Sequence, residues 1–209
     1  MPLKKGKHAP DINTEQKIKK AARVVFHDKG FAGARTRDIA EAANINLALL
    51  NYYFRSKEKL FQIIMVETLA EFNQAMGEVF NDESTTLEKK IQLVSEKYID
   101  IIIAEPEIPI FIMTEIRSHG AEILEKLPAN TILQSSFIKQ YRQAVKDKTI
   151  SEQNPLHFLM NLTGLITFPF INSPILKKVG NLSDSQFNNL MKERKKKIPI
   201  WIKAMFTAS

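Results

Sequence analysis

Residues 44–61, which read NINLALLNYYFRSKEKLF, combine side chains that recognise nucleic acid with side chains that a small domain must bury. An Asn amide can form two hydrogen bonds with the edge of an adenine, and Leu or Ala can contact the methyl group of thymine. Tyr hydroxyls and Lys ammonium groups bind phosphate oxygens. The chemistry that these residue types predict is recognition rather than catalysis.

A helical period divides this segment into two faces. Leu50 and Phe54 are one turn apart and, together with Ile45, are predicted to fill the core of a small domain. Ala48 and Tyr52 lie on the opposite face and are expected to be exposed. Exposed apolar and aromatic groups with basic neighbours need a covering surface that is rich in phosphate, and the major groove of DNA admits a helix. The outward face is therefore predicted to enter a DNA groove.

The charge of the chain supports a polyanionic partner. Of the 209 residues, the first 60 contain 13 Lys and Arg against 6 Asp and Glu, which gives the whole net charge of +7. The rest of the chain contains 17 residues of each sign and is neutral. A basic N-terminal region indicates that this part of the protein binds the polyanion.

Three short helices are predicted to position this surface. The first contains an apolar stripe with the spacing of an amphipathic helix, namely Ile18, Ala21, Ala22, Val25 and Phe26. Gly30 is expected to end it with a positive φ angle, and Thr36 is expected to cap the second helix. Asn44 tolerates the left-handed conformation of a tight turn, and Asn46 is expected to cap the third helix. Two short helices joined by a tight turn form a helix-turn-helix.

The rest of the chain is also predicted to be helical. A helix from Ser56 to about Asn81 would span roughly 39 Å. Further helical patterns cover residues 87–104, 109–120, 121–127, 133–146, 156–171 and 184–206. Residues 156–171 carry no charge, but they are too short and too interrupted by proline to predict a membrane span. A helix that is apolar on every side must be buried on every side, so the pattern predicts that a second chain covers one face.

Several kinds of chemistry lack the residues that they need. The chain contains no Cys, which excludes disulfides, thiolate metal sites and a cysteine nucleophile and suits a cytoplasmic protein. The four His residues show no metal-ligand spacing, and the sequence has no Gly-rich phosphate loop. We therefore expect no cofactor, no metal and no enzyme activity.

The segment TRDIAEAANINLALLNYYFRSKEKLF resembles the DNA-binding segment of the tetracycline-repressor (TetR) family of bacterial transcriptional regulators. The resemblance covers about residues 14–61 and depends on residues at fixed spacing, namely Phe26, Gly30, Phe31, Thr36, Ile39, Ala40, Tyr53, Phe54, Ser56, Lys57 and Glu58. The sequence departs from the family pattern in that Asn44 replaces a usual Gly, Leu47 and Leu49 stand where polar residues are frequent, and Asn51 stands where Tyr is frequent. These departures prevent a base-by-base transfer of contacts.

The resemblance implies an all-α homodimer that binds a palindromic operator in double-stranded DNA. It implies a helix-turn-helix domain at residues 13–58 and a helical effector-binding and dimerisation domain at residues 59–209. Residues 1–12 contain basic residues without an apolar run behind them, and this pattern predicts a flexible basic arm. The residues predicted to contact DNA are Thr36, Arg37, Asn46, Leu47, Ala48, Leu49, Asn51, Tyr52, Tyr53 and Lys57.

The C-terminal domain is expected to enclose a small, largely apolar effector of unidentified structure. The candidate pocket residues are Tyr98, Ile102, Phe111, Met113, Phe137, Tyr141, Phe158 and Asn161. The candidate residues of the dimer interface are Leu162, Leu165, Ile166, Phe187, Leu190, Met191, Ile198, Trp201 and Ile202.

The mechanism that these expectations favour is a repressor in which the long helix after Ser56 is a lever between effector and DNA. Two alternatives use the same residues. A non-specific, nucleoid-type DNA-binding protein would have the same basic head, and an all-helical enzyme could have a similar pocket. Selection of a preferred sequence from random duplexes distinguishes the first alternative, and the missing catalytic constellation disfavours the second.

Overall fold

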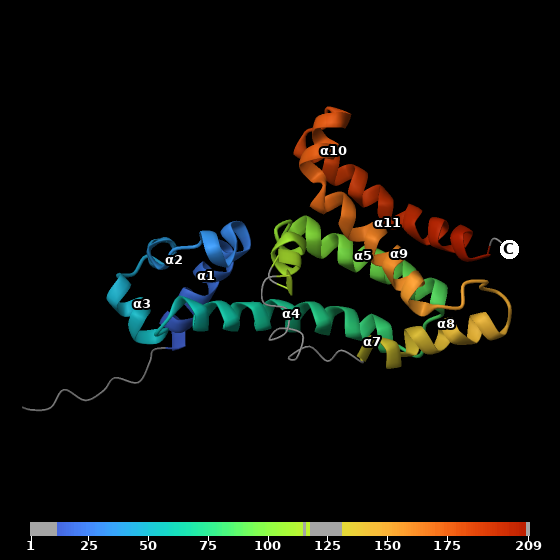
Figure 1. Cartoon of the computed structure of the whole chain (residues 1–209), viewed down its shortest axis with the longest axis horizontal. Coiled ribbons are helices and arrows are strands. Elements are labelled where there is room, and N and C mark those ends of the chain that lie inside the picture. The colour runs from blue at the N-terminus through green and yellow to red at the C-terminus, as the bar shows by residue number, and fades with distance from the viewer. Residues whose placement is uncertain (1–11, 115, 118–130, 208–209) are drawn as a thin grey trace, which may run out of the picture. The chain divides into compact units, whose positions relative to one another are not determined.

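The computed structural model describes residues 12–114, 116–117 and 131–207, and every regular element in these ranges is an α-helix (Figure 1). The named helices are α1 (Ile12–Gly33), α2 (Thr36–Ala42), α3 (Leu47–Tyr53), α4 (Lys57–Asn81), α5 (Leu87–Ala104), α7 (Thr131–Gln134), α8 (Ser136–Lys146), α9 (Pro155–Ile171), α10 (Ser173–Gly180) and α11 (Asp184–Thr207). Residues 108–114 and 116–117 are also helical. The predicted all-α fold class is confirmed.

The chain divides into two compact units. Unit 1 comprises residues 1–69 and 111–118, and unit 2 comprises residues 70–110 and 119–209. Helix α4 therefore contributes to both units, and the division falls further along α4 than the boundary predicted at residue 58. The reason is that α4 packs on α1 well beyond its first turn, as the hydrogen bond between His27 Nε2 and Thr68 Oγ1 (3.0 Å) shows. The predicted arm, except for Ile12, lies outside the described residues.

The core of unit 1 forms where α1 meets the start of α4. The predicted α1 stripe is buried, and the ring of Phe26 makes an edge contact with that of Phe61 at 5.1 Å between centroids. Gly30 has a φ angle of 65°, as predicted, which a residue without a Cβ adopts readily. After this bend the Phe31 ring also packs on Phe61, with their ring centroids 4.9 Å apart. Two aromatic contacts thus fix α4 against α1.

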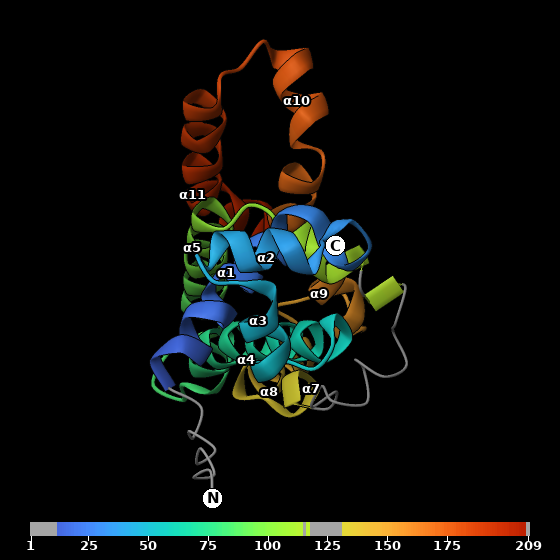
Figure 2. The same ribbon diagram turned by 90° about the vertical axis from the view of Figure 1, so that its left-hand side faces the viewer.

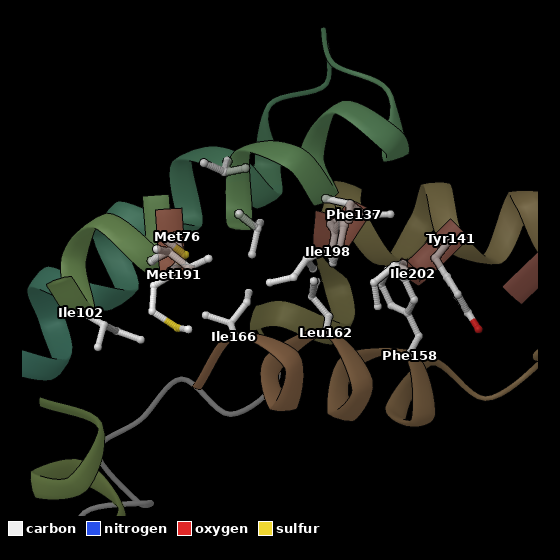
Figure 3. Packing of buried hydrophobic residues seen from close by; sticks show 14 of the residues in the cluster. Met76, Ile102, Phe137, Tyr141, Phe158, Leu162, Ile166, Met191, Ile198 and Ile202 are labelled. Carbon is white, nitrogen blue, oxygen red and sulfur yellow. The ribbon is translucent and has the colours of Figure 1, made fainter. Parts of the chain in front are cut away.

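Unit 2 has a separate core formed mainly by α5, α8, α9 and α11 (Figure 3). From one face of α9, Phe158, Leu162 and Ile166 point toward Ile198 and Ile202 of α11 (Figure 3). All five side chains are at most 1 % exposed. Burial of one aliphatic or aromatic side chain of this kind stabilises a fold by about 1.5–3 kcal/mol. This face of α9 is therefore committed to its own chain.

Two features of unit 2 differ from the prediction. The helix expected at residues 133–146 is divided into α7 and α8, because Ser135 has an extended backbone and its Oγ caps α8 by accepting from the Ile138 N–H. Helix α10 was not predicted. It starts with Pro174 in its first turn, where the missing N–H costs no hydrogen bond, and ends at Asn181 with a φ angle of 49°. In Figures 1 and 2, α10 lies at the end of unit 2 that is remote from α7 and α8.

Among the described helices, one pair of consecutive helices is long and apolar enough, taken together, to compare with a membrane span. No single helix among them is both long and apolar enough to cross a bilayer. Helices α9 and α10 meet the length and composition criteria only together, and they are bent by 68° relative to each other. The helix predicted at residues 121–127 lies outside the described residues.

Candidate nucleic-acid interface

The turn between α2 and α3 has the predicted conformation. Asn44 has a φ angle of 50°, in the left-handed region that Asn tolerates better than most residues. Two residues later, Asn46 Oδ1 accepts a hydrogen bond from the Leu49 N–H at 2.8 Å and caps α3. The Asn46 oxygen is therefore used within the chain, and only its amide nitrogen can donate to DNA. The two Asn residues determine the direction in which α3 leaves the turn.

Helix α3 has one inner and one outer face, as predicted. Leu50 and Phe54 are 1 % and 4 % exposed and belong to the unit 1 core. Ala48, Asn51 and Tyr52 are exposed, and the exposed fraction of Tyr52 reaches 58 %. The outer face thus presents a small apolar group, an amide and a phenol to solvent, which are three groups that can contact base edges or phosphates.

The remaining predicted contacts of α3 are less accessible. Leu47, Leu49 and Tyr53 are half-buried. The Tyr53 ring makes an edge contact with the ring of Tyr52, with their centroids 5.5 Å apart. The two Tyr rings thus lie next to each other at the end of α3, close in sequence to Asn51.

The start of α2 differs slightly from the prediction. Arg35, not Thr36, is the residue that precedes the helix, because Arg35 has an extended backbone and Thr36 already has the helical conformation. Arg37 is exposed, and Lys29 forms an ion pair with Asp38 at 2.8 Å. The hydrogen bond from Lys29 lowers the pKa of Asp38 below its ordinary value. The Asp38 carboxylate is therefore neutralised beside the basic surface.

Lys57, a predicted phosphate contact, has partners within the chain, and the phosphate contact stays a prediction. Its Nζ donates to the carbonyl oxygens of Phe31 and Ala34 at 2.9 and 3.1 Å, and it lies 4.2 Å from the centroid of the Phe31 ring. An ammonium group has three N–H donors, so these two acceptors leave one. Lys57 ties the start of α4 to the segment between α1 and α2. Nearby Arg55 and Lys59 are exposed to solvent.

Two predicted pocket residues belong to unit 1. Phe111 is 3 % exposed, and its ring centroid lies 5.8 Å from that of Phe61 and 4.7 Å from that of His27. Met113, in contrast, is 54 % exposed. Phe111 is therefore a core residue of unit 1, and a pocket role for these two residues stays a prediction.

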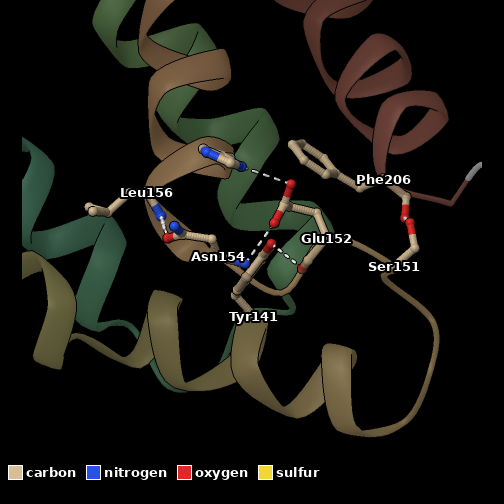
Figure 4. Close-up of polar contacts among 7 residues, drawn as sticks. Tyr141, Ser151, Glu152, Asn154, Leu156 and Phe206 are labelled. Atoms are coloured by element: carbon tan, nitrogen blue, oxygen red, sulfur yellow. Dashed lines mark hydrogen bonds and ion pairs between the residues drawn. The ribbon is translucent and has the colours of Figure 1, made fainter.

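Four other candidates are core residues of unit 2. Ile102, Phe137, Tyr141 and Phe158 are completely buried in the core of unit 2. Tyr141 Oη donates to the carbonyl oxygen of Glu152 at 2.6 Å (Figure 4). Burial and the nearby Glu152 charge raise the pKa of Tyr141 to about 12. These side chains have partners in the chain, so packing explains them without an effector.

The last two pocket candidates have opposite surroundings. Tyr98 packs its ring against Phe72 at 4.7 Å between centroids, and burial raises the pKa of its hydroxyl to about 12. Asn161 is exposed on the outer face of α9. Only Tyr98 therefore remains a candidate polar anchor inside unit 2.

The predicted dimer residues also separate into two sets. Those buried in the unit 2 core are Leu162, Ile166, Phe187, Met191, Ile198 and Ile202, and this part of the prediction is corrected. Leu190 and Trp201 are 41 % and 36 % exposed, whereas Leu165 is half-buried.

The sequence did not predict which face of α9 is exposed. It exposes Leu156, Met160 and Phe168 at 51 %, 59 % and 59 %. A helix that is apolar all round gives no periodic signal for which face is inward. Which face of α9 is buried becomes clear from the residues of the other helices that pack against it.

An arginine joins α9 to α11 in a way that sequence reasoning missed. Pro169 lies inside α9 and has no N–H, so the carbonyl of Leu165, four residues earlier, lacks its helical donor. Arg194 Nη2 of α11 donates to this carbonyl at 2.7 Å, and its guanidinium lies 4.9 Å from the centroid of Trp201. Burial lowers the pKa of Arg194. A proline in a core helix is the signal that could have led to this pairing.

A group of polar contacts lies at the start of α9 (Figure 4). Asn154 Oδ1 caps the helix by accepting from the Leu156 N–H at 2.9 Å. Glu152 accepts from the Asn154 N–H at 2.7 Å and lies 3.0 Å from His157 Nδ1. The hydrogen bond from the Asn154 N–H is the largest cause of a lowered pKa of the Glu152 carboxyl, and the contact with His157 lowers it further.

A basic helix-turn-helix with an accessible second helix, followed by a helical domain, defines a DNA-binding transcriptional regulator. The family model described as "Bacterial regulatory proteins, tetR family" matches residues 18–64, which contain this site. The helix-turn-helix part of the chain, residues 18–64, is therefore a TetR-family DNA-binding domain.

Individual proteins agree with this family assignment. The chain is 24 % identical over 204 residues to YttP of Bacillus subtilis, named "Probable HTH-type transcriptional regulator", and the match covers 93 % of this chain and 95 % of YttP. It is 35 % identical over 107 residues to the HTH-type transcriptional repressor NicS of Pseudomonas putida, covering 51 % and 50 % of the two chains. In fold it is similar to the transcriptional regulator SCO4942 of Streptomyces coelicolor, with a TM-score of 0.63 at 20 % identity and coverage of 94 % and 99 %.

Proposed function

We propose that the chain is a ligand-responsive repressor that binds a palindromic operator as a homodimer and releases it when a small, largely apolar effector binds unit 2. As a protein that acts on chromosomal DNA, it would work in the cytoplasm. The observation that carries the proposal is the outer face of α3, where Ala48, Asn51 and Tyr52 are exposed on a helix whose other face is locked in the core.

This outer face suits the major groove in size and chemistry. Helix α3 has seven residues, which is about two turns, and that length reaches three or four base pairs. Asn51 can read adenine, Ala48 can contact a thymine methyl group, and Tyr52 can reach a phosphate. The exposed Arg37, Arg55 and Lys59 supply sequence-independent attraction.

The proposed release depends on α4. This helix has residues in both units, so an effector that alters the packing of α4 in unit 2 changes the direction in which unit 1 is held. Two heads on a palindrome must lie about one helical turn, or ~34 Å, apart or at a multiple of that distance. An effector that favours another spacing shifts the population away from the DNA-bound state. The hydroxyl of Tyr98 is the proposed polar anchor.

The test is selection of binding sites from random duplexes with the full chain, followed by affinity measurements on the enriched sequence. We expect an inverted repeat to be enriched. The matched variants are Asn51→Ala, which removes the proposed base reader, and Gln62→Ala, a polar exposed residue on α4. Asn51→Ala should relax the preference at one position of each half-site, whereas Gln62→Ala should leave the motif unchanged.

The competing results are distinct. Tight binding without any enriched motif would assign the chain to non-specific, nucleoid-type binding. Enrichment of a single half-site without a repeat would contradict the homodimer and leave the reading helix in place. A compound that raises the melting temperature of the chain but leaves operator affinity unchanged would refute the coupling through α4.

A further inference from the structure

Helix α3 contains no charged side chain, which restricts the bases that it can select. Its seven residues, LALLNYY, include no Lys, Arg, Asp or Glu. In the major groove, guanine is read mainly by Arg or Lys at its O6 and N7 acceptors, and the amino group of cytosine is read by Asp or Glu. Helix α3 therefore lacks the residue types with which proteins most often select a G·C pair.

The groups that α3 does present to solvent match an A·T pair. Asn51 is exposed, and its amide can form two hydrogen bonds with adenine N6 and N7. Leu47 and Ala48 lie four and three residues before Asn51, so they are its neighbours on the helix surface. Ala48 is exposed and Leu47 is half-buried. The apolar group that base pairs offer in the major groove is the C5-methyl of thymine. An amide beside two aliphatic groups thus complements adenine beside thymine methyl groups.

Other polar groups near α3 are already used or belong to another helix. Asn46 Oδ1 accepts from the Leu49 N–H at 2.8 Å, so the Asn46 amide lacks the free acceptor that a two-bond contact with adenine requires. The Asp38 carboxylate is paired with Lys29 at 2.8 Å. Arg37 is exposed, but it belongs to α2. The base pairs that face α3 itself are thus left to Asn51 and its aliphatic neighbours.

We propose that the base pairs facing α3 in each half-site of the operator are A·T pairs, and that their recognition depends on thymine methyl groups. This inference rests on the proposed function, in which the outer face of α3 enters the major groove. Asn51 reads one adenine, and Leu47 and Ala48 contact the methyl groups of neighbouring thymines. Tyr52 contacts a phosphate and adds affinity without a base preference.

The first test uses the sequences that the full chain selects from random duplexes. The position whose base preference is lost in Asn51→Ala identifies the base pair that faces α3. We expect A·T at this position and at the adjacent positions that face α3, in both half-sites. An enriched inverted repeat with G·C at these positions, or one whose preferences Asn51→Ala leaves unchanged, would overturn the inference while the sequence-specific dimer stands. A library without any enriched motif would overturn the proposed function, and the inference with it.

The second test replaces thymidine by deoxyuridine in the selected operator. This change removes the C5-methyl group and keeps the base pairing. Affinity should fall about fourfold for each contacted methyl, the value of one buried group of this size. The matched probe carries deoxyuridine at thymidine positions outside the A·T block and should bind like the unmodified operator. Equal affinity for thymidine and deoxyuridine inside the block would refute the dependence on methyl groups, even if the block is rich in A·T.

Protein variants assign the methyl contacts to side chains through a double-mutant cycle. In Leu47→Ala, deoxyuridine should no longer weaken binding at the position that Leu47 covers. Ala48→Gly, at an exposed position, gives the same cycle for the adjacent methyl group. Tyr52→Phe is the control, because it loses only a hydroxyl and should weaken binding to both operators by the same factor. Melting curves show whether each variant is folded. If the effects of deoxyuridine and of both aliphatic variants were simply additive, Leu47 and Ala48 would not contact the methyl groups and their proposed role would be wrong.

Discussion

Helices α3 and α9 present the same physical problem with different solutions. Each buries one face in its own unit and leaves apolar or aromatic side chains exposed on the other, namely Tyr52 on α3 and Met160 and Phe168 on α9. Both faces expose an amide, Asn51 on α3 and Asn161 on α9, and the exposed groups of α3 have the basic neighbours Arg55 and Lys59. On α9 no charged residue is present over 17 positions. The uncovered apolar groups of the two helices thus differ in the charge of their surroundings, and basic surroundings are those that suit DNA.

The inner faces of the two helices also differ in what surrounds them. Leu50 and Phe54 of α3 are held by a small core that a few aromatic rings define. Phe158 of α9 contacts the rings of Phe137, Tyr141 and Phe206 in a much larger cluster. A change on the inner face of α9 should therefore affect stability most, and a change on either outer face should affect binding most.

The largest effect is expected for Phe158→Ala on the inner face of α9. Removing a completely buried aromatic ring leaves a cavity and should lower the free energy of unfolding by about 3–5 kcal/mol. Phe168→Ala, the same change on the outer face, should lower the unfolding free energy of the isolated monomer by no more than about 0.5 kcal/mol. Urea denaturation of dilute protein measures both. Equal destabilisation by the two changes would contradict the distinction between the faces.

A smaller effect separates Lys57 from Lys59. Lys57→Met leaves the carbonyls of Phe31 and Ala34 without their charged donor and should destabilise unit 1 by about 1.5–3 kcal/mol. Lys59→Met should have little effect on stability but should reduce the slope of log affinity against log salt by about 1. Denaturation and DNA titrations at several salt concentrations give the two quantities. If Lys57→Met changed only the salt slope, Lys57 would contact phosphate, as predicted from the sequence.

The next effect concerns specificity. Asn51→Ala should cost about 1–3 kcal/mol of discrimination at one base pair per half-site, because Asn forms two hydrogen bonds with adenine. The exposed position of Asn51 means that the free energy of unfolding should change by less than about 0.5 kcal/mol. Competition binding with single-base variants of the selected operator measures the discrimination. An equal loss of affinity for every duplex would show that Asn51 contacts the backbone instead.

The sequence predicted unit 1 better than unit 2 for a physical reason. Helices α1 and α3 are amphipathic, and their ends have strong local signals, such as Gly30 with a φ angle of 65° and Asn46 as an N-cap. Local signals of this type do not depend on distant residues. The inner and outer faces of α3, and the bounds of α4 and α5 to within one residue, could therefore be predicted.

The features that could not be predicted depend on contacts between distant segments. Lys57 was assigned to phosphate because its charge is visible in the sequence, whereas its carbonyl acceptors at Phe31 and Ala34 are not. The pairing of Arg194 with Leu165 requires that α9 and α11 are known to be neighbours. For α9, an apolar residue type at every position left inner and outer faces equivalent, and Leu162 and Ile166 were placed at an interface although they are core residues.

The smallest expected effect is a pH dependence of stability that comes from Glu152 at the start of α9. It tests whether the polar contacts there stabilise the helix. The pKa of Glu152 is lowered by the Asn154 N–H and by His157, so the ionised carboxylate is favoured in the folded chain. This contribution is complete above the ordinary carboxyl value near 4.5 and is lost as the pH falls through the lower pKa of the folded state. Glu152→Gln should therefore reduce the melting temperature slightly at neutral pH and flatten its decline below about pH 4.5. The control is Glu193→Gln, an exposed carboxylate on α11 whose pairing with Lys197 at 3.6 Å is loose. If the melting temperatures of wild type and Glu152→Gln changed with pH in the same way between pH 3 and 7, capping by Asn154 alone would hold the start of α9.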